Sequence, residues 1–229
     1  MICEEYKCIF VHIPKVAGQS VEHFFLNKLE LDWDTEREKL YLLKNSDPAK
    51  GTEKLGHLAA SEYVGCGHIS QQKFDEYFKF SFVRNPWARL VSEYRYRNYF
   101  RYKSFKDFVL NKMPPPGFDD NYRHVMPQYD MLYDDKGKCL VDFVGRFESL
   151  QKDFTEVCER MGFDESKLPY VNSSEKKSRI LRRKVKSFIY RNGESDKKHY
   201  TEFYDAETQN AVTEYYQKDI EAFKYSFGE

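Results

Sequence analysis

The sequence predicts an α/β fold in which a central, mostly parallel sheet lies between layers of helices. Apolar runs of strand length alternate along the chain with stretches whose apolar residues recur at helical spacing. Two of the strands lead directly into helices, as in units with parallel strands and crossover helices. With 229 residues, we expect one domain spanning residues 1–229.

The first half of the chain contains two apolar strands, each followed by a helix. Pro86 can begin the second of these helices because its missing N–H costs nothing in the first turn. The predicted elements are a strand at 7–13, helices at 18–29 and 34–43, a polar loop at 45–56, a tight turn at 65–68, a short helix at 71–78, a strand at 78–83, and a helix from 86 to about 100.

The second half adds a third strand and two longer helices. The run Pro114-Pro-Pro-Gly117 breaks the chain, and Gly162 is placed to end a helix at its C′ position. Asp205 is suited to cap the last helix. The predicted elements are a strand at 140–145, a helix at 148–161 and a closing helix at 206–223.

Composition excludes several classes of protein. Lys and Arg together number 37, as do Asp and Glu, which argues against a nucleic-acid binder driven by overall charge. No apolar run is long enough to span a bilayer, and no signal peptide is visible. The five cysteines form no CxxC pair, which favours free thiols in a reducing compartment and argues against a zinc site.

One segment is strongly basic despite the balanced total. Residues 172–200 contain ten Lys or Arg residues and three Asp or Glu residues. Such a segment could bind an anionic ligand or substrate, or it could be the solvated face of a helix.

The first strand–helix junction has the composition of an anion-binding loop. Its sequence is Pro14-Lys-Val-Ala-Gly-Gln-Ser20. Unpaired N–H groups at a helix start attract an anion, and Gly18 permits a close approach of the backbone. Lys15 adds a positive charge, and Gln19 and Ser20 add donors. The spacing is not that of a Walker A loop, which weakens an ATPase or kinase interpretation, and an ordinary turn with an exposed lysine stays open.

The second junction offers a side-chain anion site. Arg84 follows the strand, and Ser92 lies eight residues later, slightly more than two helical turns away. The planar guanidinium of Arg84 suits a phosphate, provided that the anion lies along the side of the helix. Alternatively, Arg84 pairs with a carboxylate and Ser92 packs between helices.

Together the two junctions resemble the cofactor motifs of carbohydrate sulfotransferases that use 3′-phosphoadenosine 5′-phosphosulfate (PAPS). The segment His12-Ile-Pro-Lys-Val-Ala-Gly-Gln-Ser20 is similar to the 5′-phosphosulfate loop of the chondroitin and dermatan 4-O- and uronosyl 2-O-sulfotransferases. The segment from Phe82 to Tyr94 is similar to their 3′-phosphate motif, with Asn85 in place of the usual aspartate. Segments 143–150 and 219–227 also resemble the family.

This resemblance implies a P-loop-NTPase-like three-layer fold and a role for each motif residue. Lys15 would stabilise the leaving group, and the amides of residues 15–20 would hold the 5′-phosphate. Arg84 and Ser92 would hold the 3′-phosphate of PAPS and of its product PAP. Lys197 or Lys198 would close over the nucleotide. The implied cofactor-binding residues are Pro14, Lys15, Val16, Ala17, Gly18, Gln19, Ser20, Arg84, Ser92 and Lys198.

The acceptor hydroxyl needs a base, and a histidine suits that role near neutral pH. We favour His68, because Gly65-Cys-Gly-His-Ile-Ser70 resembles the segment that carries the base in uronosyl 2-O-sulfotransferases. Cys66 stands where those enzymes can have a second histidine. His57 and His124 are the alternatives. No metal is expected to be required, since lysine and amides can neutralise the leaving phosphate.

We therefore expect in-line transfer of a sulfuryl group from PAPS to a hydroxyl of a carbohydrate, and the basic segment 172–200 favours an anionic one. The alternatives are a small alcohol, a lipid-linked sugar or a protein tyrosine as acceptor, or a nucleotide-binding protein or kinase without sulfotransferase activity. A cytoplasmic enzyme is the simplest expectation. A trimmed catalytic domain from the Golgi lumen is the alternative, because animal members of the family are anchored there.

Overall fold

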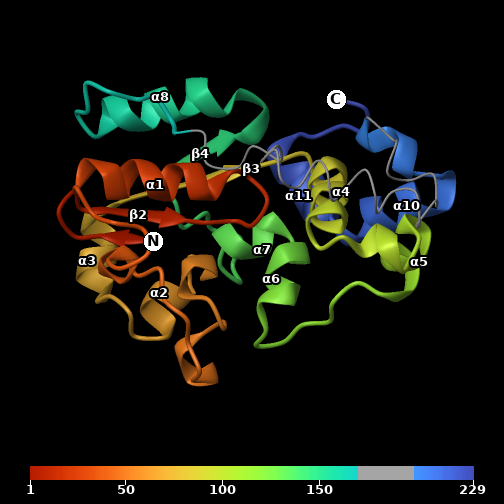
Figure 1. Ribbon diagram of the computed structural model, residues 1–229, viewed down its shortest axis with the longest axis horizontal. Helices are drawn as coiled ribbons and strands as arrows, with labels where there is room; N and C mark the ends of the chain where they lie inside the picture. Colours follow the sequence, from red (N-terminus) through yellow and green to blue (C-terminus); the bar gives the residue numbers. More distant parts are fainter. Residues whose placement is uncertain (170–198) are drawn as a thin grey trace. The chain divides into compact units, whose positions relative to one another are not determined.

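The computed structural model describes residues 1–169 and 199–229 and contains a four-stranded sheet (Figure 1). The strands follow the order β1-β2-β3-β4 across the sheet. β1 pairs antiparallel with β2, whereas β2–β3 and β3–β4 are parallel. The strands are β1 (Ile2–Cys3), β2 (Cys8–Val11), β3 (Phe78–Val83) and β4 (Phe143–Arg146). The predicted α/β fold with a mostly parallel sheet is confirmed.

The chain separates into two compact units, which we describe one at a time. The first comprises residues 1–84 and 115–169 and contains the whole sheet. The second comprises residues 85–114 and, within the described part of the chain, residues 199–229. The single domain expected over residues 1–229 stays a prediction.

Helices cover both faces of the sheet in the first unit. In Figure 1, α1 and α8 lie along one face, and α2 and α3 lie on the other. The first face is aromatic: Phe10 and Phe80 stack with ring centroids 5.2 Å apart, and Phe24 of α1 contacts Phe154 of α8 at 4.8 Å. The helices are α1 (Gly18–Lys28), α2 (Glu62–Gly65), α3 (Gln71–Glu76), α6 (Asp120–Val125), α7 (Gln128–Leu132) and α8 (Leu150–Arg160).

The register of the parallel strands determines which loops come together. Phe10 lies opposite Phe80, and Val11 lies opposite Ser81. The chain leaving β2 and the chain leaving β3 therefore emerge at the same edge of the sheet. In α/β proteins this carboxyl edge is where ligands bind.

The second unit packs helices around aromatic side chains. Tyr94 is fully buried and makes edge contacts with Phe105 at 5.3 Å and with Phe203 at 6.1 Å. The helices are α4 (Pro86–Tyr96), α5 (Phe105–Asn111), α10 (Ala206–Tyr215) and α11 (Gln217–Phe223). Asp205 caps α10 as predicted, accepting a hydrogen bond from the Thr208 amide at 2.8 Å.

Two predicted helices are wrong in extent. Residues 34–43 form only a short 3-10 turn, because the Asp32 carboxylate accepts from the amides of Asp34 and Thr35 and closes a tight turn there. The closing helix is interrupted at Tyr216, which has ψ 24°. The 3-10 turns of both units are Arg37–Leu40, Pro48–Lys50, Leu55–His57, Tyr99–Arg101, Phe147–Ser149 and Tyr200–Phe203.

Other boundaries differ by a few residues. The strand β3 matches the predicted 78–83, whereas β4 begins at Phe143 rather than at residue 140. The helix expected at 86–100 ends at Tyr96. None of the helices in residues 1–169 and 199–229 has the length and apolarity needed to cross a membrane.

Candidate active site

Residues 14–20, which lead from β2 into the first residues of α1, have a backbone conformation suited to an anion; we call this segment the phosphate loop. Lys15 and Ala17 both have left-handed conformations, with φ 75° and 66°. Turns of this kind direct successive N–H groups into one concavity. Each left-handed non-glycine residue costs about 1 kcal/mol or more, and such strain is concentrated at functional sites.

The start of α1 has no side-chain cap. Ala17 occupies the N-cap position but supplies no side-chain hydrogen bond, and the first turn contains no acidic residue. The positive end of the helix dipole is therefore not neutralised by a carboxylate of its own first turn. Lys15 is half-buried and Gln19 is exposed in this loop.

His12 supports the phosphate loop from within the first unit. A Cβ atom added at Gly18 would lie 2.1 Å from the His12 Cδ2 and Nε2 atoms, so only glycine fits there. His12 in turn contacts the Glu22 carboxylate of α1, with Nδ1 and Oε1 2.6 Å apart. Both side chains are buried. The loop, the end of β2 and α1 are thus locked together through one imidazole.

Arg84 reaches the phosphate loop, as the strand register requires. Its Nη1 donates to the Lys15 carbonyl at 3.1 Å, and its guanidinium lies over the Phe147 ring, 4.1 Å from the centroid. Its backbone is tied to Gln128, which accepts from the Arg84 amide at 2.8 Å and donates to the Arg84 carbonyl at 2.8 Å. The structure therefore brings Arg84 of the second motif to the first motif, from which it is separated by about 70 residues in the sequence.

The structure does not test the roles predicted for the cofactor residues Ser92 and Lys198. Ser92 is half-buried on α4 and belongs to the second unit, whereas Arg84 belongs to the first. Their joint role at a 3′-phosphate stays a prediction. Lys197 and Lys198, together with nearly all of the basic segment 172–200, lie outside the described residues.

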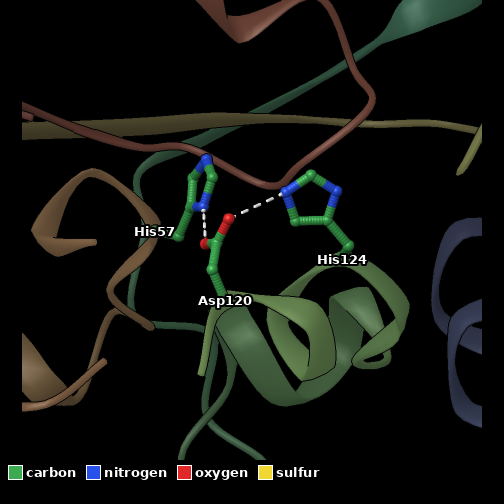
Figure 2. A group of neighbouring side chains, drawn as sticks. All are labelled: His57, Asp120 and His124. Atoms are coloured by element: carbon green, nitrogen blue, oxygen red, sulfur yellow. Dashed lines mark hydrogen bonds and ion pairs between the residues drawn. The ribbon is translucent and has the colours of Figure 1, made fainter. Parts of the chain in front are cut away.

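Two of the six histidines share one carboxylate in the first unit (Figure 2). His57 Nδ1 lies 2.5 Å from Asp120 Oδ1, and His124 Nε2 lies 3.2 Å from Asp120 Oδ2. Asp120 and His124 face the same side of α6 because they are four residues apart. A third side chain, the cationic Lys54, contacts Asp120 Oδ2 at 2.5 Å.

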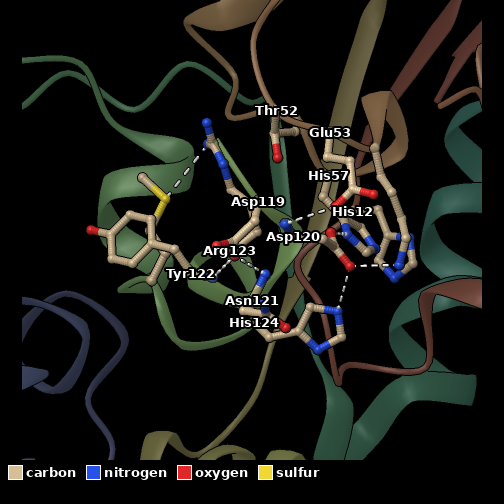
Figure 3. Close-up of polar contacts among 12 residues, drawn as sticks. His12, Thr52, Glu53, His57, Asp119, Asp120, Asn121, Tyr122, Arg123 and His124 are labelled. Carbon is tan, nitrogen blue, oxygen red and sulfur yellow. Dashed lines mark hydrogen bonds and ion pairs between the residues drawn. The ribbon is translucent and has the colours of Figure 1, made fainter. Parts of the chain in front are cut away.

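This His57–Asp120–His124 cluster is next to the imidazole that supports the phosphate loop. The His12 and His57 rings meet edge to face, with centroids 4.9 Å apart (Figure 3). The segment that carries His57 is anchored just after it: Glu62 accepts from the Ala59 amide at 2.7 Å, and Met131 accepts from the Ala60 amide at 2.8 Å.

Burial and charge together determine the ionisation of this region. Burial lowers the pKa of His57 to about 4, although the hydrogen bond and charge of Asp120 oppose that shift. Burial alone would raise the pKa of Asp120, but hydrogen bonds and charge from His124 and His57 outweigh it and hold the pKa well below its usual range. Burial likewise opposes ionisation of Glu22, and the charge and hydrogen bond of His12 outweigh it and lower the pKa.

The same three side chains could reach one metal ion. Their ligand atoms lie within 4.8 Å of one another. However, His57 already donates to Asp120, and the Lys54 ammonium contacts the same carboxylate at 2.5 Å. A cation in that position would be repelled by Lys54. The contacts are therefore those of a hydrogen-bonded network, and we assign these side chains no metal.

His68, our sequence-based choice for the base, has both ring nitrogens engaged. Nε2 lies 2.9 Å from the Lys50 carbonyl, to which it can only donate, and Nδ1 lies 3.2 Å from the Tyr41 hydroxyl. His68 lines a surface depression together with Glu4, which belongs to the turn before β2, whereas the phosphate loop follows β2. The role of His68 stays a prediction, and its contacts do not support it.

The remaining two histidines have local structural contacts. His23 stacks on Trp33, with ring centroids 4.2 Å apart. His199 is exposed, and its Nδ1 lies 2.8 Å from the Thr201 hydroxyl oxygen.

Sequence reasoning did not identify Asp120, Glu22, Lys54 or Gln128. One signal could have found Asp120: Asp119 is an N-cap residue, and Asp120 and His124 follow at helical spacing. The amide of Asn121 donates to Asp119 at 2.7 Å and so begins α6 at this position. Glu22, Lys54 and Gln128 carry no comparable pattern, because their partners are distant in the sequence.

Comparison with known proteins agrees with this arrangement. The family model described as "Sulfotransferase family" matches residues 1–226. An uncharacterized protein from Archaeoglobus fulgidus is 35% identical over 101 residues, which cover 42% of this chain and 78% of that protein. No solved structure matches the chain significantly.

Proposed function

This chain belongs to the sulfotransferase family, and on that premise we propose that it transfers a sulfuryl group from PAPS to a hydroxyl of a carbohydrate. The family is P-loop-like in fold, which accords with the parallel sheet and the strand–loop–helix at residues 8–28. The observation that carries the proposal is the phosphate loop, with two left-handed residues before an uncapped helix start and Arg84 at its side.

The residues of this loop fit the phosphate end of such a nucleotide. Its turn conformation favours convergent N–H groups, and Gly18 keeps the loop backbone against His12, where a Cβ atom would not fit. Lys15 and Arg84 add two positive charges at the same edge of the sheet. When bound, PAPS supplies the sulfuryl group and a phosphate leaving group.

The protein's part is then positioning and charge stabilisation. The loop amides and Lys15 would hold the phosphate that departs, since preorganised donors lower the cost of charge that develops there. A histidine would accept the proton of the acceptor hydroxyl. A carbohydrate acceptor is favoured by the likeness of both motifs to those of carbohydrate sulfotransferases, and a protein tyrosine or a small alcohol is the alternative.

Calorimetry with PAP, ADP and ATP tests the nucleotide. We expect PAP to bind at micromolar concentration and to bind more tightly than ADP, which lacks the 3′-phosphate. Arg84→Ala should weaken PAP binding by roughly 1.5–3 kcal/mol, the range for hydrogen bonds to charged groups. The matched control is Arg160→Ala, which removes another guanidinium that lies over a phenyl ring, at 4.9 Å from the Phe143 centroid.

A screen of hydroxyl acceptors with radiolabelled PAPS tests the reaction. Lys15→Ala should lower turnover by about 10²- to 10³-fold, as for loss of one donor to a developing anion. Preference for ATP over PAP would overturn the proposal in favour of a kinase. Binding of PAP without transfer to saccharides, alcohols or tyrosine peptides would indicate a nucleotide-binding protein that lacks the activity.

A further inference from the structure

The His57–Asp120–His124 cluster contains one imidazole nitrogen that is placed to accept a proton. His57 must carry its proton on Nδ1, because Nδ1 lies 2.5 Å from an Asp120 carboxylate oxygen that can only accept. In the neutral ring, Nε2 then has a lone pair. Within residues 1–169 and 199–229, no side chain or carbonyl forms a hydrogen bond with His57 Nε2.

We propose that His57 is the catalytic base of the sulfuryl transfer and that Asp120 positions it, held in place by Lys54 and His124. The inference rests on the proposed function and identifies the residue that activates the acceptor.

The other histidines near the site are less suitable. The Nε2 of His12 lies beneath Gly18, and its Nδ1 contacts Glu22. His68 uses both nitrogens on Lys50 and Tyr41, as described above. His124 directs Nε2 at Asp120, and its side chain is 6% exposed, against 13% for His57. His57 therefore combines an available nitrogen with the greater access to a ligand.

Asp120 is built to hold one orientation. Its two oxygens have different partners, His57 on Oδ1 and both Lys54 and His124 on Oδ2. A carboxylate held from both sides cannot rotate without breaking a charged contact. It therefore keeps the His57 ring in one tautomer, as the aspartate of a Ser-His-Asp triad does for its histidine.

The proton and bond balance is simple. His57 Nε2 takes the proton of the acceptor hydroxyl as that oxygen bonds to sulfur. The bond from sulfur to the phosphate oxygen breaks, and its electron pair leaves with the phosphate. The proton on His57 then passes to solvent, so one hydroxyl and one PAPS give one sulfate ester, one PAP and one proton.

The surroundings of His57 keep it in the form that a base requires. His12 contacts it from the end of β2, Asp120 and His124 from α6, and Glu22 is the nearby acid of α1. Lys54 acts on it through Asp120. With its pKa lowered to about 4, His57 is neutral at pH 7. Its protonation should limit turnover only well below the ordinary histidine pKa of about 6.5.

Nitrogen NMR of the protein labelled in its histidines tests the positioning without any ligand. The His57 signals, assigned by their absence in His57→Gln, should report a protonated Nδ1, an unprotonated Nε2 and a pKa below about 6.5. Asp120→Asn should change the tautomer, and Asp120→Glu should restore it in part. A wild-type His57 with its proton on Nε2, or one unaffected by Asp120→Asn, would overturn the inference.

Turnover and PAP binding then separate the two proposals. His57→Gln and Asp120→Asn should lower turnover about 10²- to 10⁴-fold, with PAP affinity unchanged within threefold. His68→Gln tests the other candidate base and should lower turnover far less than His57→Gln. His23→Gln, at a ring that stacks on Trp33, is the matched control and should keep turnover within threefold. Full activity in His57→Gln would refute the base. If the wild-type protein binds no PAP, the proposed function fails, whatever the NMR result.

Discussion

The two strand–helix junctions at the carboxyl edge of the sheet satisfy their backbone groups in opposite ways. After β2, Ala17 stands at the helix start without a side-chain hydrogen bond, and two residues adopt left-handed conformations. After β3, the Asn85 side chain accepts from the Ala88 amide at 3.2 Å, and Pro86 has no N–H to satisfy.

This difference shows what each junction can offer to an anion. At the first junction, the left-handed conformations of Lys15 and Ala17 favour convergent backbone N–H groups, at a cost in backbone strain. The second is closed, since Gln128 also binds the amide and the carbonyl of Arg84. Its contribution to the first unit is a side chain, the Arg84 guanidinium. Two segments of the same topology thus have different chemistry because only one of them caps its helix.

The largest loss of stability is expected in acid, because the first junction lies next to His12, whose ring contacts that of His57. The unfolded chain protonates His57 near pH 6.5, whereas the folded protein does so near pH 4. The unfolded state therefore binds the extra proton first as the pH falls. Above about pH 6.5, neutral His57 should contribute its full share, about 3 kcal/mol, to the free energy of unfolding. This contribution should be lost as the pH falls to about 4.

Urea denaturation between about pH 7 and pH 4 measures this loss. The variant His57→Gln should flatten the profile in that window, because Asp120 and Glu22 have lowered pKa values and titrate only at lower pH. An equally steep profile in the variant would place the acid sensitivity elsewhere.

A smaller effect is expected from Gly18→Ala. The new Cβ atom would lie 2.1 Å from the His12 ring, which is buried and tied to Glu22 and so cannot easily move. Overpacking of this kind costs about 1–3 kcal/mol of stability. PAP binding should weaken as well, since the loop backbone must shift.

Gly65→Ala is the control, because no atom lies within 4 Å of a Cβ atom there. We expect it to be neutral in denaturation and in calorimetry. Equal behaviour of the two variants would show that the contact of His12 with Gly18 does not shape the loop.

The smallest effect should come from Asn85→Asp, which restores the usual residue of the family motif. An aspartate still caps α4, but it cannot replace the Nδ2 donation to the Ser226 carbonyl at 3.0 Å. Two acceptors would then face each other in a buried position, and stability should fall by about 1 kcal/mol, the lower end of the range for an unsatisfied buried group.

Asn45→Asp is the matched control, since Asn45 Nδ2 also donates to a carbonyl, that of Thr52 at 3.1 Å, but at a half-buried position. Thermal denaturation should show the smaller loss at Asn45. A stabilised Asn85→Asp would mean that the amide serves another purpose than closing the second junction.

Much of the fold follows from local patterns in the sequence. The strand at 78–83, the helix that begins at Pro86 and the cap at Asp205 agree with the structure, because each depends on neighbouring residues. The helix predicted at 34–43 is wrong because the carboxylate of Asp32 closes a local turn. The mixed-charge pattern of these residues does not indicate that turn.

The candidate site divides in the same way. The phosphate loop could be predicted from the sequence, because Lys15, Gly18 and the helix start lie within a few residues of one another. The choice among six histidines could not, since it depends on partners distant in the chain. His57 and Asp120 are 63 residues apart, and only the packing of α6 against the His57 segment brings them into contact.

The sequence by itself thus determined the parallel α/β architecture and the positions of the two strand–helix junctions, because apolar periodicity and backbone propensity act over a few residues. Only the tertiary structure decided that Arg84 meets the phosphate loop and that His57, rather than His68, keeps an available nitrogen. The physical reason is that these hydrogen bonds and this burial depend on how separate elements pack together. The number of residues between two side chains does not indicate how far apart they lie in the folded protein.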